Sequence, residues 1–218
     1  MTIKVGDALP AGTLNEFIEV EGNGCSVGPN TFQVADLAKG KKIAIFGLPG
    51  AFTPTCSAKH VPSYLDNFAA LKGKGVDEIW CFAVNDAFVM GAWARDQKAD
   101  DKIRFMADGS ADYTKKLGLE LDLTARGMGV RCQRFSMLVV DGVVKTLNVE
   151  GPGKFEVSDG ATMLVAVRSG RSSASGCTPC GLFASKAATC TVVAETRRLL
   201  LSPGPSVTAL FRSVRTIT

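Results

Sequence analysis

A nucleophilic cysteine is indicated by residues 49–56, whose sequence is PGAFTPTC. Thr53 followed by Pro54 is typical of a helix start, with Thr53 as the N-cap residue and Pro54 at the first helical position. Cys56 is then the third residue of the helix, where unpaired backbone N–H groups and the positive end of the helix dipole favour a negative charge. Because the thiolate is the nucleophilic form of cysteine, this position predicts a reactive sulfur. The alternative is a small apolar side chain packed under the helix start.

The only histidine of the chain, His60, follows Cys56 by four residues and shares its helix face. One interpretation makes His60 the base of a Cys–His pair, as in thiol hydrolases. The other, which we favour, is that His60 packs or forms a hydrogen bond near the helix start. A single histidine also excludes metal sites built from several histidines.

Residues 1–167 alternate between patterns typical of buried strands and of helices. Short apolar runs predict strands at 43–48, 78–84 and 103–106. Helical spacing and helix-start signals predict helices at 53–71, 87–96, 111–117 and about 158–165, the last with Ser158 as its N-cap. Asp141 and Gly142, between the runs 134–140 and 143–149, are typical of a two-residue hairpin turn. These units predict an α/β, thioredoxin-like fold with a mixed central sheet flanked by helices.

Composition indicates a globular domain at residues 1–167 and an atypical basic tail at 168–218. The tail has seven basic residues and one acidic residue, a net charge of +6. Because the whole chain has a net charge of +4, residues 1–167 have a net charge of −2. The basic character therefore belongs to the tail, which we expect to be poorly ordered, and it does not favour nucleic-acid binding by the domain. No apolar run is long enough to span a membrane, and no signal-peptide pattern opens the chain, so a cytoplasmic location is expected.

Several segments of the chain resemble one family. The sequences FTPTCS at 52–57, HVP at 60–62, VNDAFVM at 84–90, AWA at 92–94 and RFS at 134–136 are similar to those of atypical two-cysteine peroxiredoxins, the plant-like type II subfamily. The resemblance covers about residues 3–165. It implies a thiol-dependent peroxidase that reduces hydrogen peroxide and alkyl hydroperoxides without a metal or organic cofactor. It also implies glutaredoxin or thioredoxin as electron donor and a homodimer, to which Phe52, Phe88 and Trp93 are candidate contributors.

The same resemblance assigns the peroxide pocket to Pro49, Thr53, Cys56 and Arg134. The Thr53 hydroxyl would donate to the thiolate or orient a peroxide oxygen, and Pro49, which has no N–H group, would shield the sulfur. The Arg134 guanidinium would stabilise the thiolate and the charge that develops on the peroxide. Arg131 is the alternative for this role, but the family pattern places the arginine directly before Phe135.

After attack on a peroxide, Cys56 would become a sulfenic acid that a second thiol must resolve. The resemblance assigns this role to Cys81, although a free cysteine in a strand is often only a core residue. A strand cysteine and a helix cysteine are expected to lie farther apart than the ~7 Å limit on Cα separation for a disulfide, so the turn around Cys56 must unwind. A redox sensor that signals through oxidised Cys56 is the rival function.

The other five cysteines carry no predicted role. Cys25 and Cys132 have no supporting pattern. The pair Cys177 and Cys180, together with Cys190, lies in the tail, where type II peroxiredoxins have no counterpart. A CxxC pair with no preceding strand and no second pair of ligands is a weak signal for redox or zinc chemistry.

Overall fold

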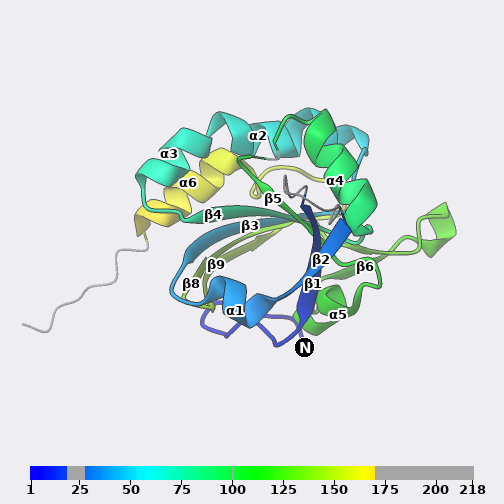
Figure 1. Ribbon diagram of the computed structural model, residues 1–218, viewed down its shortest axis with the longest axis horizontal. Coiled ribbons are helices and arrows are strands. Elements are labelled where there is room, and N and C mark those ends of the chain that lie inside the picture. The colour runs from blue at the N-terminus through cyan, green and yellow to red at the C-terminus, as the bar shows by residue number, and fades with distance from the viewer. Residues whose placement is uncertain (19–27, 100, 170–218) are drawn as a thin grey trace, which may run out of the picture. The chain divides into compact units, whose positions relative to one another are not determined.

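The computed structural model describes residues 1–18, 28–99 and 101–169 of the 218-residue chain. A seven-stranded mixed sheet forms its centre, in the order β2-β1-β5-β4-β3-β8-β9 (Figure 1). The three middle strands β5, β4 and β3 are parallel, and the outer pairings are antiparallel. The strands are β1 (Thr13–Ile18), β2 (Gly28–Gln33), β3 (Lys42–Leu48), β4 (Glu78–Ala83), β5 (Arg104–Ala107), β8 (Phe135–Val140) and β9 (Val143–Val149).

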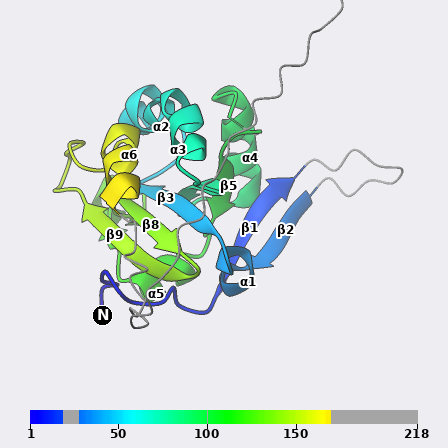
Figure 2. The ribbon, with the colours of Figure 1, turned by 90° about the vertical axis from the view of Figure 1, so that its left-hand side faces the viewer.

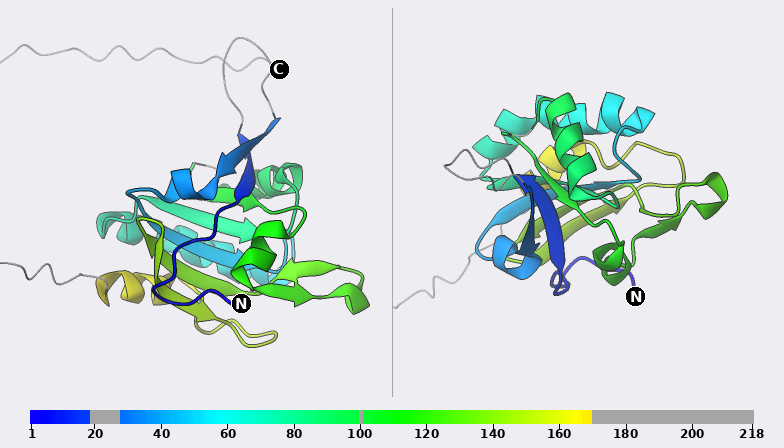
Figure 3. Two further views of the ribbon diagram at one scale, coloured as in Figure 1. Left: turned by 90° about the horizontal axis from the view of Figure 1, so that it is seen from below. Right: turned by 45° about the vertical axis from the view of Figure 1, so that its right-hand side comes forward.

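Helices cover both faces of this sheet, as the sequence predicts. One face carries the π-helical turn η1 (Cys56–His60) and the helices α2 (Val61–Asp66), α3 (Phe68–Gly73), α4 (Ala87–Asp96) and α6 (Gly160–Ser169). The opposite face carries α1 (Val34–Ala38) and α5 (Asp112–Leu117), and Figures 1 and 2 show the two helical layers. A separate ribbon of β6 (Glu120–Asp122) and β7 (Val130–Cys132), with the 3-10 turn η2 (Thr124–Arg126), extends past the end of the main sheet (Figure 3).

Two apolar cores lie on the two faces because strand side chains alternate between them. The core under α2, α4 and α6 contains Tyr64, Trp93 and both Cys56 and Cys81. The core under α1 and α5 contains Trp80 and, separately from the other two cysteines, Cys132. The three thiols in the described part of the chain are therefore divided between the faces, and only two of them share a core.

The pairing of β3 with β8 decides what lies next to the end of β3. Gly47 pairs with Phe135, and a Cβ atom on Gly47 would lie 2.0 Å from the Phe135 ring. Only glycine allows this close approach of the ring to the strand. Arg134, which directly precedes Phe135, is thereby placed beside the loop that follows Leu48.

The predicted hairpin turn is confirmed, because Asp141 and Gly142 both have positive φ, at 49° and 73°. The predicted cap of the last helix is wrong. Asp159, rather than Ser158, accepts from the N–H groups of Ala161 and Thr162, at 2.8 and 3.0 Å. The Ser158 hydroxyl is used elsewhere, as a donor to Glu150. The sequence did not indicate the hairpin of β1 and β2, which forms one edge of the sheet.

The last described helix ends at Ser169, just past the predicted domain boundary. The rest of the tail with Cys177, Cys180 and Cys190, and also Cys25, lies outside the described residues. Within the described part of the chain, no helix has the length and apolar character needed to cross a membrane.

Candidate active site

Cys56 lies in the first turn of the helix that follows β3, as predicted, but the turn is π-helical. The Val61 N–H donates to the Cys56 carbonyl, five residues back, and the Ser57 N–H donates to the Thr53 carbonyl at 3.0 Å. Single π-helical turns occur often at functional sites. The Cys56 side chain is fully buried, so the sulfur is reached only by small molecules or after local movement.

Thr53 does not cap the helix through its side chain. Its hydroxyl instead donates to the Gly50 carbonyl at 2.9 Å, which closes the loop on itself. A hydroxyl has one proton and two lone pairs, so donation to Gly50 leaves only its acceptor capacity for a further partner. The predicted donation from Thr53 to the thiolate is therefore not made in this conformation, whereas acceptance of a peroxide proton is left open.

Arg134 is the arginine that reaches the sulfur. Its Nη2 atom donates to Cys56 Sγ at 3.4 Å, and its Nη1 atom lies 2.9 Å from His60 Nδ1. Arg131 instead donates to the backbone carbonyls of Met128 and Val84, at 2.7 and 3.0 Å. The planar guanidinium of Arg134 can hold two partners at once, and its positive charge beside the sulfur favours the thiolate.

Both ring nitrogens of His60 are engaged. Nε2 lies 3.0 Å from the Ser158 carbonyl, which only accepts, so Nε2 carries the proton and Nδ1 accepts from Arg134. Burial, followed by the charge of Arg134, lowers the pKa of His60 from 6.5 to about 3. A neutral imidazole whose free lone pair is already occupied by Arg134 is not available as a base for Cys56. The Cys–His hydrolase interpretation therefore has no structural basis here.

The loop between β3 and the Cys56 turn is held by residues of the neighbouring β4–α4 segment. Asn85 Oδ1 accepts from the Ala51 N–H at 3.0 Å, and the Trp93 indole N–H donates to Ser57 Oγ at 3.0 Å. Phe52 has a φ of 58°, and its exposed ring lies 6.2 Å from the Trp93 ring. The two hydrogen bonds could not be predicted from local sequence patterns, because they join residues that are more than 30 positions apart.

Pro49 is half-buried and lies with Arg134 in the wall of a pocket of about 220 Å³. The remaining wall consists of residues of the β6 strand, Gln133 and the loop after β9: Leu121, Glu150, Gly151, Pro152, Gly153 and Lys154. Pro49 and Arg134 therefore line the same pocket, and the shielding role of Pro49 stays a prediction.

Cys81 lies in the middle of β4, where it pairs with Phe46 on β3 and with Phe105 on β5. Its side chain is fully buried, and both Cys81 and Cys56 are free thiols. Burial, and then the proximity of Cys56 and Cys132, raises the pKa of Cys81 well above its ordinary value. Cys81 is therefore a protonated thiol in the core that it shares with Cys56.

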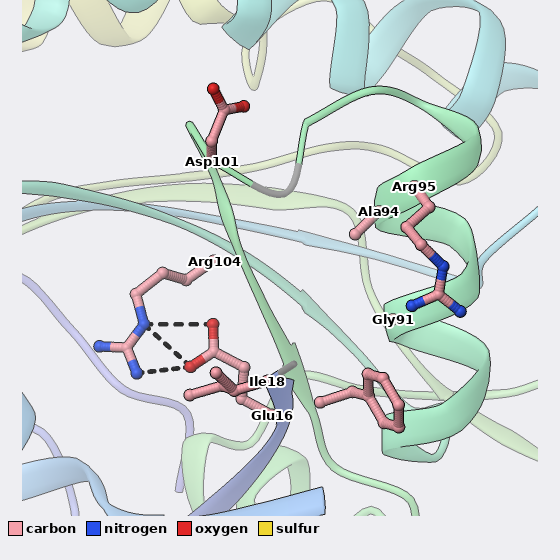
Figure 4. Close-up of a pocket in the computed structure, with 8 residues that line it drawn as sticks. Glu16, Ile18, Gly91, Ala94, Arg95, Asp101 and Arg104 are labelled. Atoms are coloured by element: carbon pink, nitrogen blue, oxygen red, sulfur yellow. Dashed lines mark hydrogen bonds and ion pairs between the residues drawn. The ribbon is translucent and has the colours of Figure 1, made fainter. Parts of the chain in front are cut away.

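A larger pocket, of about 460 Å³, lies away from this site, between the end of β1, α4 and the start of β5. Two of its charged residues are paired with each other, since Arg104 binds Glu16 through Nε and Nη2 (Figure 4), and Arg104 also pairs with Glu78 at 3.0 Å. The described residues contain no group of three or more His, Cys, Asp or Glu side chains that could hold a metal ion.

Comparison with known proteins agrees with this geometry. Residues 4–164 match the Redoxin family model. The chain is 49% identical over 165 residues to Peroxiredoxin-2B of Arabidopsis thaliana, covering 76% of this chain and 98% of the relative. It is 44% identical over 168 residues to Peroxiredoxin-2C of Oryza sativa subsp. japonica, with coverage of 76% and 98%.

A solved structure leads to the same family. Reduced Prx3 from Vibrio vulnificus, crystallised in complex with hydrogen peroxide, is 46% identical, with a TM-score of 0.70 and coverage of 76% of this chain and 99% of that one. The matched share of this chain is the part that contains the mixed sheet and the Cys56 turn. The chain therefore belongs to the peroxiredoxin family, with a thioredoxin-like fold, and is a thiol-dependent peroxidase.

Proposed function

We propose that this peroxiredoxin reduces hydrogen peroxide and small alkyl hydroperoxides through Cys56. The observation that carries the proposal is the 3.4 Å contact between Arg134 Nη2 and Cys56 Sγ inside a buried turn. A cation held next to the sulfur favours the thiolate, and it also lies next to the oxygen that gains charge during attack. Full burial of the sulfur favours small peroxides over bulky ones.

The first step is an in-line attack of the Cys56 thiolate on one peroxide oxygen. The S–O bond forms as the O–O bond breaks, and the leaving oxygen takes a proton to depart as water or as an alcohol. Cys56 is oxidised to a sulfenic acid. Thr53, whose own proton is directed to Gly50, accepts the O–H of the peroxide and so orients it, while Pro49 keeps other reagents from the sulfur.

The second step is resolution by Cys81. The Cys81 thiol attacks the sulfenic sulfur, a disulfide forms, and water leaves. Cys81 shares a core with Cys56 but is fixed in a central strand, so the Cys56 turn must unwind for the two sulfurs to meet. A dithiol protein, glutaredoxin or thioredoxin, then reduces the disulfide and returns the enzyme to its starting state.

The test of the peroxidase proposal is a single turnover followed by mapping of the oxidised sulfur. Cys56→Ser is compared with Cys132→Ser, which removes a buried thiol from the other core. After one equivalent of hydrogen peroxide in the presence of dimedone, mass spectrometry should find the adduct on Cys56 in wild type and in Cys132→Ser. An adduct on another cysteine, or unchanged peroxide consumption by Cys56→Ser, would overturn the proposal.

The resolving role is tested separately with Cys81→Ser. This variant should form the sulfenic acid at the wild-type rate but should not form an intramolecular disulfide. A disulfide that persists in Cys81→Ser would assign resolution to another thiol. Steady-state turnover with glutaredoxin or thioredoxin then distinguishes the peroxidase from a redox sensor, since a sensor stalls after one oxidation.

We also propose a homodimer that uses the surface near the Cys56 loop. Phe52 and Phe88 have 54% and 61% of their surface exposed, whereas Trp93 is fully buried and belongs to the core. Exposed aromatic rings are typical of interfaces between subunits. Sedimentation of wild type and of Phe52→Ser with Phe88→Ser tests this, and a monomeric wild type would contradict it. The cytoplasmic location stays a prediction from the sequence.

A further inference from the structure

Glu150, directly after β9, holds together the loop that follows it. The residue is 8% exposed. One of its oxygens, Oε1, accepts four hydrogen bonds: from the N–H groups of Glu156 at 2.7 Å, Val157 at 2.8 Å and Ser158 at 2.9 Å, and from Ser158 Oγ at 2.8 Å. Burial alone would raise the pKa of the Glu150 carboxyl, but these hydrogen bonds outweigh burial and lower it. Glu150 is thus an ionised carboxylate whose partners all lie in residues 156–158.

The loop that Glu150 organises sets the state of His60. The Ser158 carbonyl accepts from His60 Nε2 at 3.0 Å and from the Tyr64 hydroxyl at 3.1 Å. Because the carbonyl requires a donor, it selects the tautomer of His60 that has its proton on Nε2. That tautomer leaves Nδ1 as the acceptor for Arg134 Nη1. The position of one backbone carbonyl therefore decides which atom His60 offers to the guanidinium.

The same loop contacts Arg134 in two further ways. The Phe155 ring centroid lies 5.0 Å from that of the His60 ring. The guanidinium carbon of Arg134 lies over the Phe155 ring, 5.7 Å from its centroid. The Glu150 N–H also donates to the Arg134 carbonyl at 2.9 Å. Glu150 thus fixes the backbone of Arg134 directly and, through the loop, the two groups against which the guanidinium rests.

We propose that Glu150 is a positioning residue for peroxide reduction, acting on Cys56 through Ser158, His60 and Arg134. The inference rests on the proposed function, in which Arg134 stabilises the charge that moves onto the peroxide. Removing the carboxylate releases residues 156–158, frees His60 to change tautomer or rotate, and lets the guanidinium turn away from Sγ. A displacement of about 1 Å at such a group can lower a rate about 100-fold.

The experiment compares Glu150→Ala and Glu150→Asp with Glu156→Gln, which changes an exposed carboxylate in the same loop. Rapid-quench mass spectrometry gives the rate constant for oxidation of Cys56 by hydrogen peroxide, and alkylation by iodoacetamide reports thiolate reactivity alone. Glu150→Ala should lower the peroxide rate constant by about 10- to 100-fold, and more than it lowers alkylation. Glu150→Asp should fall between wild type and Glu150→Ala, and Glu156→Gln should match wild type.

Two readouts separate positioning from a simple contribution to loop stability. First, in an Arg134→Lys background the Glu150→Ala change should cost less than about 2-fold, because the group on which it acts is gone. Second, His60 is the only histidine, so the two ¹⁵N signals of one imidazole ring report its tautomer, which should be Nε2–H in wild type and mixed in Glu150→Ala. If Glu150→Ala does not fold, Glu150→Asp replaces it in both comparisons.

The proposal is overturned if the Glu150 variants oxidise at the Glu156→Gln rate, or if their loss persists in full beside Arg134→Lys. It is equally overturned if the His60 tautomer is unchanged in the Glu150 variants. Failure of the proposed function looks different, because Cys56 of wild type itself would then show no fast reaction with peroxide.

Discussion

The single histidine makes one consequence of the site directly measurable. His60 is fully buried, and burial together with Arg134 lowers its pKa to about 3, whereas in the unfolded chain the pKa returns to 6.5. Below pH 6.5 the unfolded chain therefore binds a proton that the folded protein does not. The contribution of His60 to the free energy of unfolding is therefore fully present above pH 6.5 and is lost as the pH falls toward 3.

The size of the effect follows from the two pKa values. With 6.5 in the unfolded chain and about 3 in the folded protein, lowering the pH from 7.5 to 5.5 costs about 1.4 kcal/mol of unfolding free energy. At pH 5.5 His60 of the folded protein is essentially unprotonated for any folded pKa below about 4. The loss of unfolding free energy therefore depends on the pKa of His60 in the unfolded chain. Most carboxyl groups are still ionised at this pH, which keeps their contribution small.

The assay is urea unfolding of the reduced, tag-free protein at both pH values, with His60→Gln as the control. Wild type should lose about 1.4 kcal/mol between pH 7.5 and 5.5, and His60→Gln should lose much less because glutamine does not titrate. A wild-type stability that is flat over this range, or an equal slope in both proteins, would refute the buried neutral imidazole. A histidine NMR signal that titrates near pH 6.5 in the folded protein would refute it as well.

Three further changes have expected outcomes. Arg134→Lys should lower the rate of Cys56 oxidation by about 100-fold in a stopped-flow competition assay. The reason is that an ammonium group cannot bind Cys56 Sγ and His60 Nδ1 at once with the fixed geometry of a planar guanidinium. A rate near that of wild type would contradict this. Thr53→Val should lower the same rate by about 10- to 100-fold and Thr53→Ser far less, since serine keeps the hydroxyl that binds Gly50; equal losses would argue for a role of the methyl group. In urea unfolding, Gly47→Ala should lower the unfolding free energy by about 3 kcal/mol, because the new methyl group clashes with the Phe135 ring. The control Gly73→Ala has open space for the methyl group and should raise the unfolding free energy by up to about 1 kcal/mol.

Much of the architecture that positions Cys56 was predictable because it depends on local signals. The apolar run of β3, the helix α4 with its bounds at Ala87 and Asp96, and the Asp141–Gly142 turn each follow from short stretches of sequence. The choice of Arg134 over Arg131 came from the family pattern, and the contact with Cys56 Sγ agrees with it.

What the sequence did not yield depends on which of several hydrogen-bond partners a side chain takes, and on pairings between segments that only the folded chain brings together. Thr53 and Ser158 are ordinary N-cap residue types, but their hydroxyls donate to Gly50 and Glu150 instead. The strand β2 contains glycine and proline and has low strand propensity, so only its pairing with β1 makes it a strand. The role of Glu150 becomes visible only once the loop after β9 has been folded against the Cys56 turn.

The hydrogen bond from Trp93 to Ser57 gives the protein a built-in optical reporter. Ser57 is next to Cys56, so any unwinding of that turn breaks the contact and changes the surroundings of the indole. The chain has two tryptophans, and Trp80 lies in the core on the opposite face of the sheet. In Trp80→Phe the emission of one ring would therefore follow the opening and closing of the turn in real time, without an attached dye.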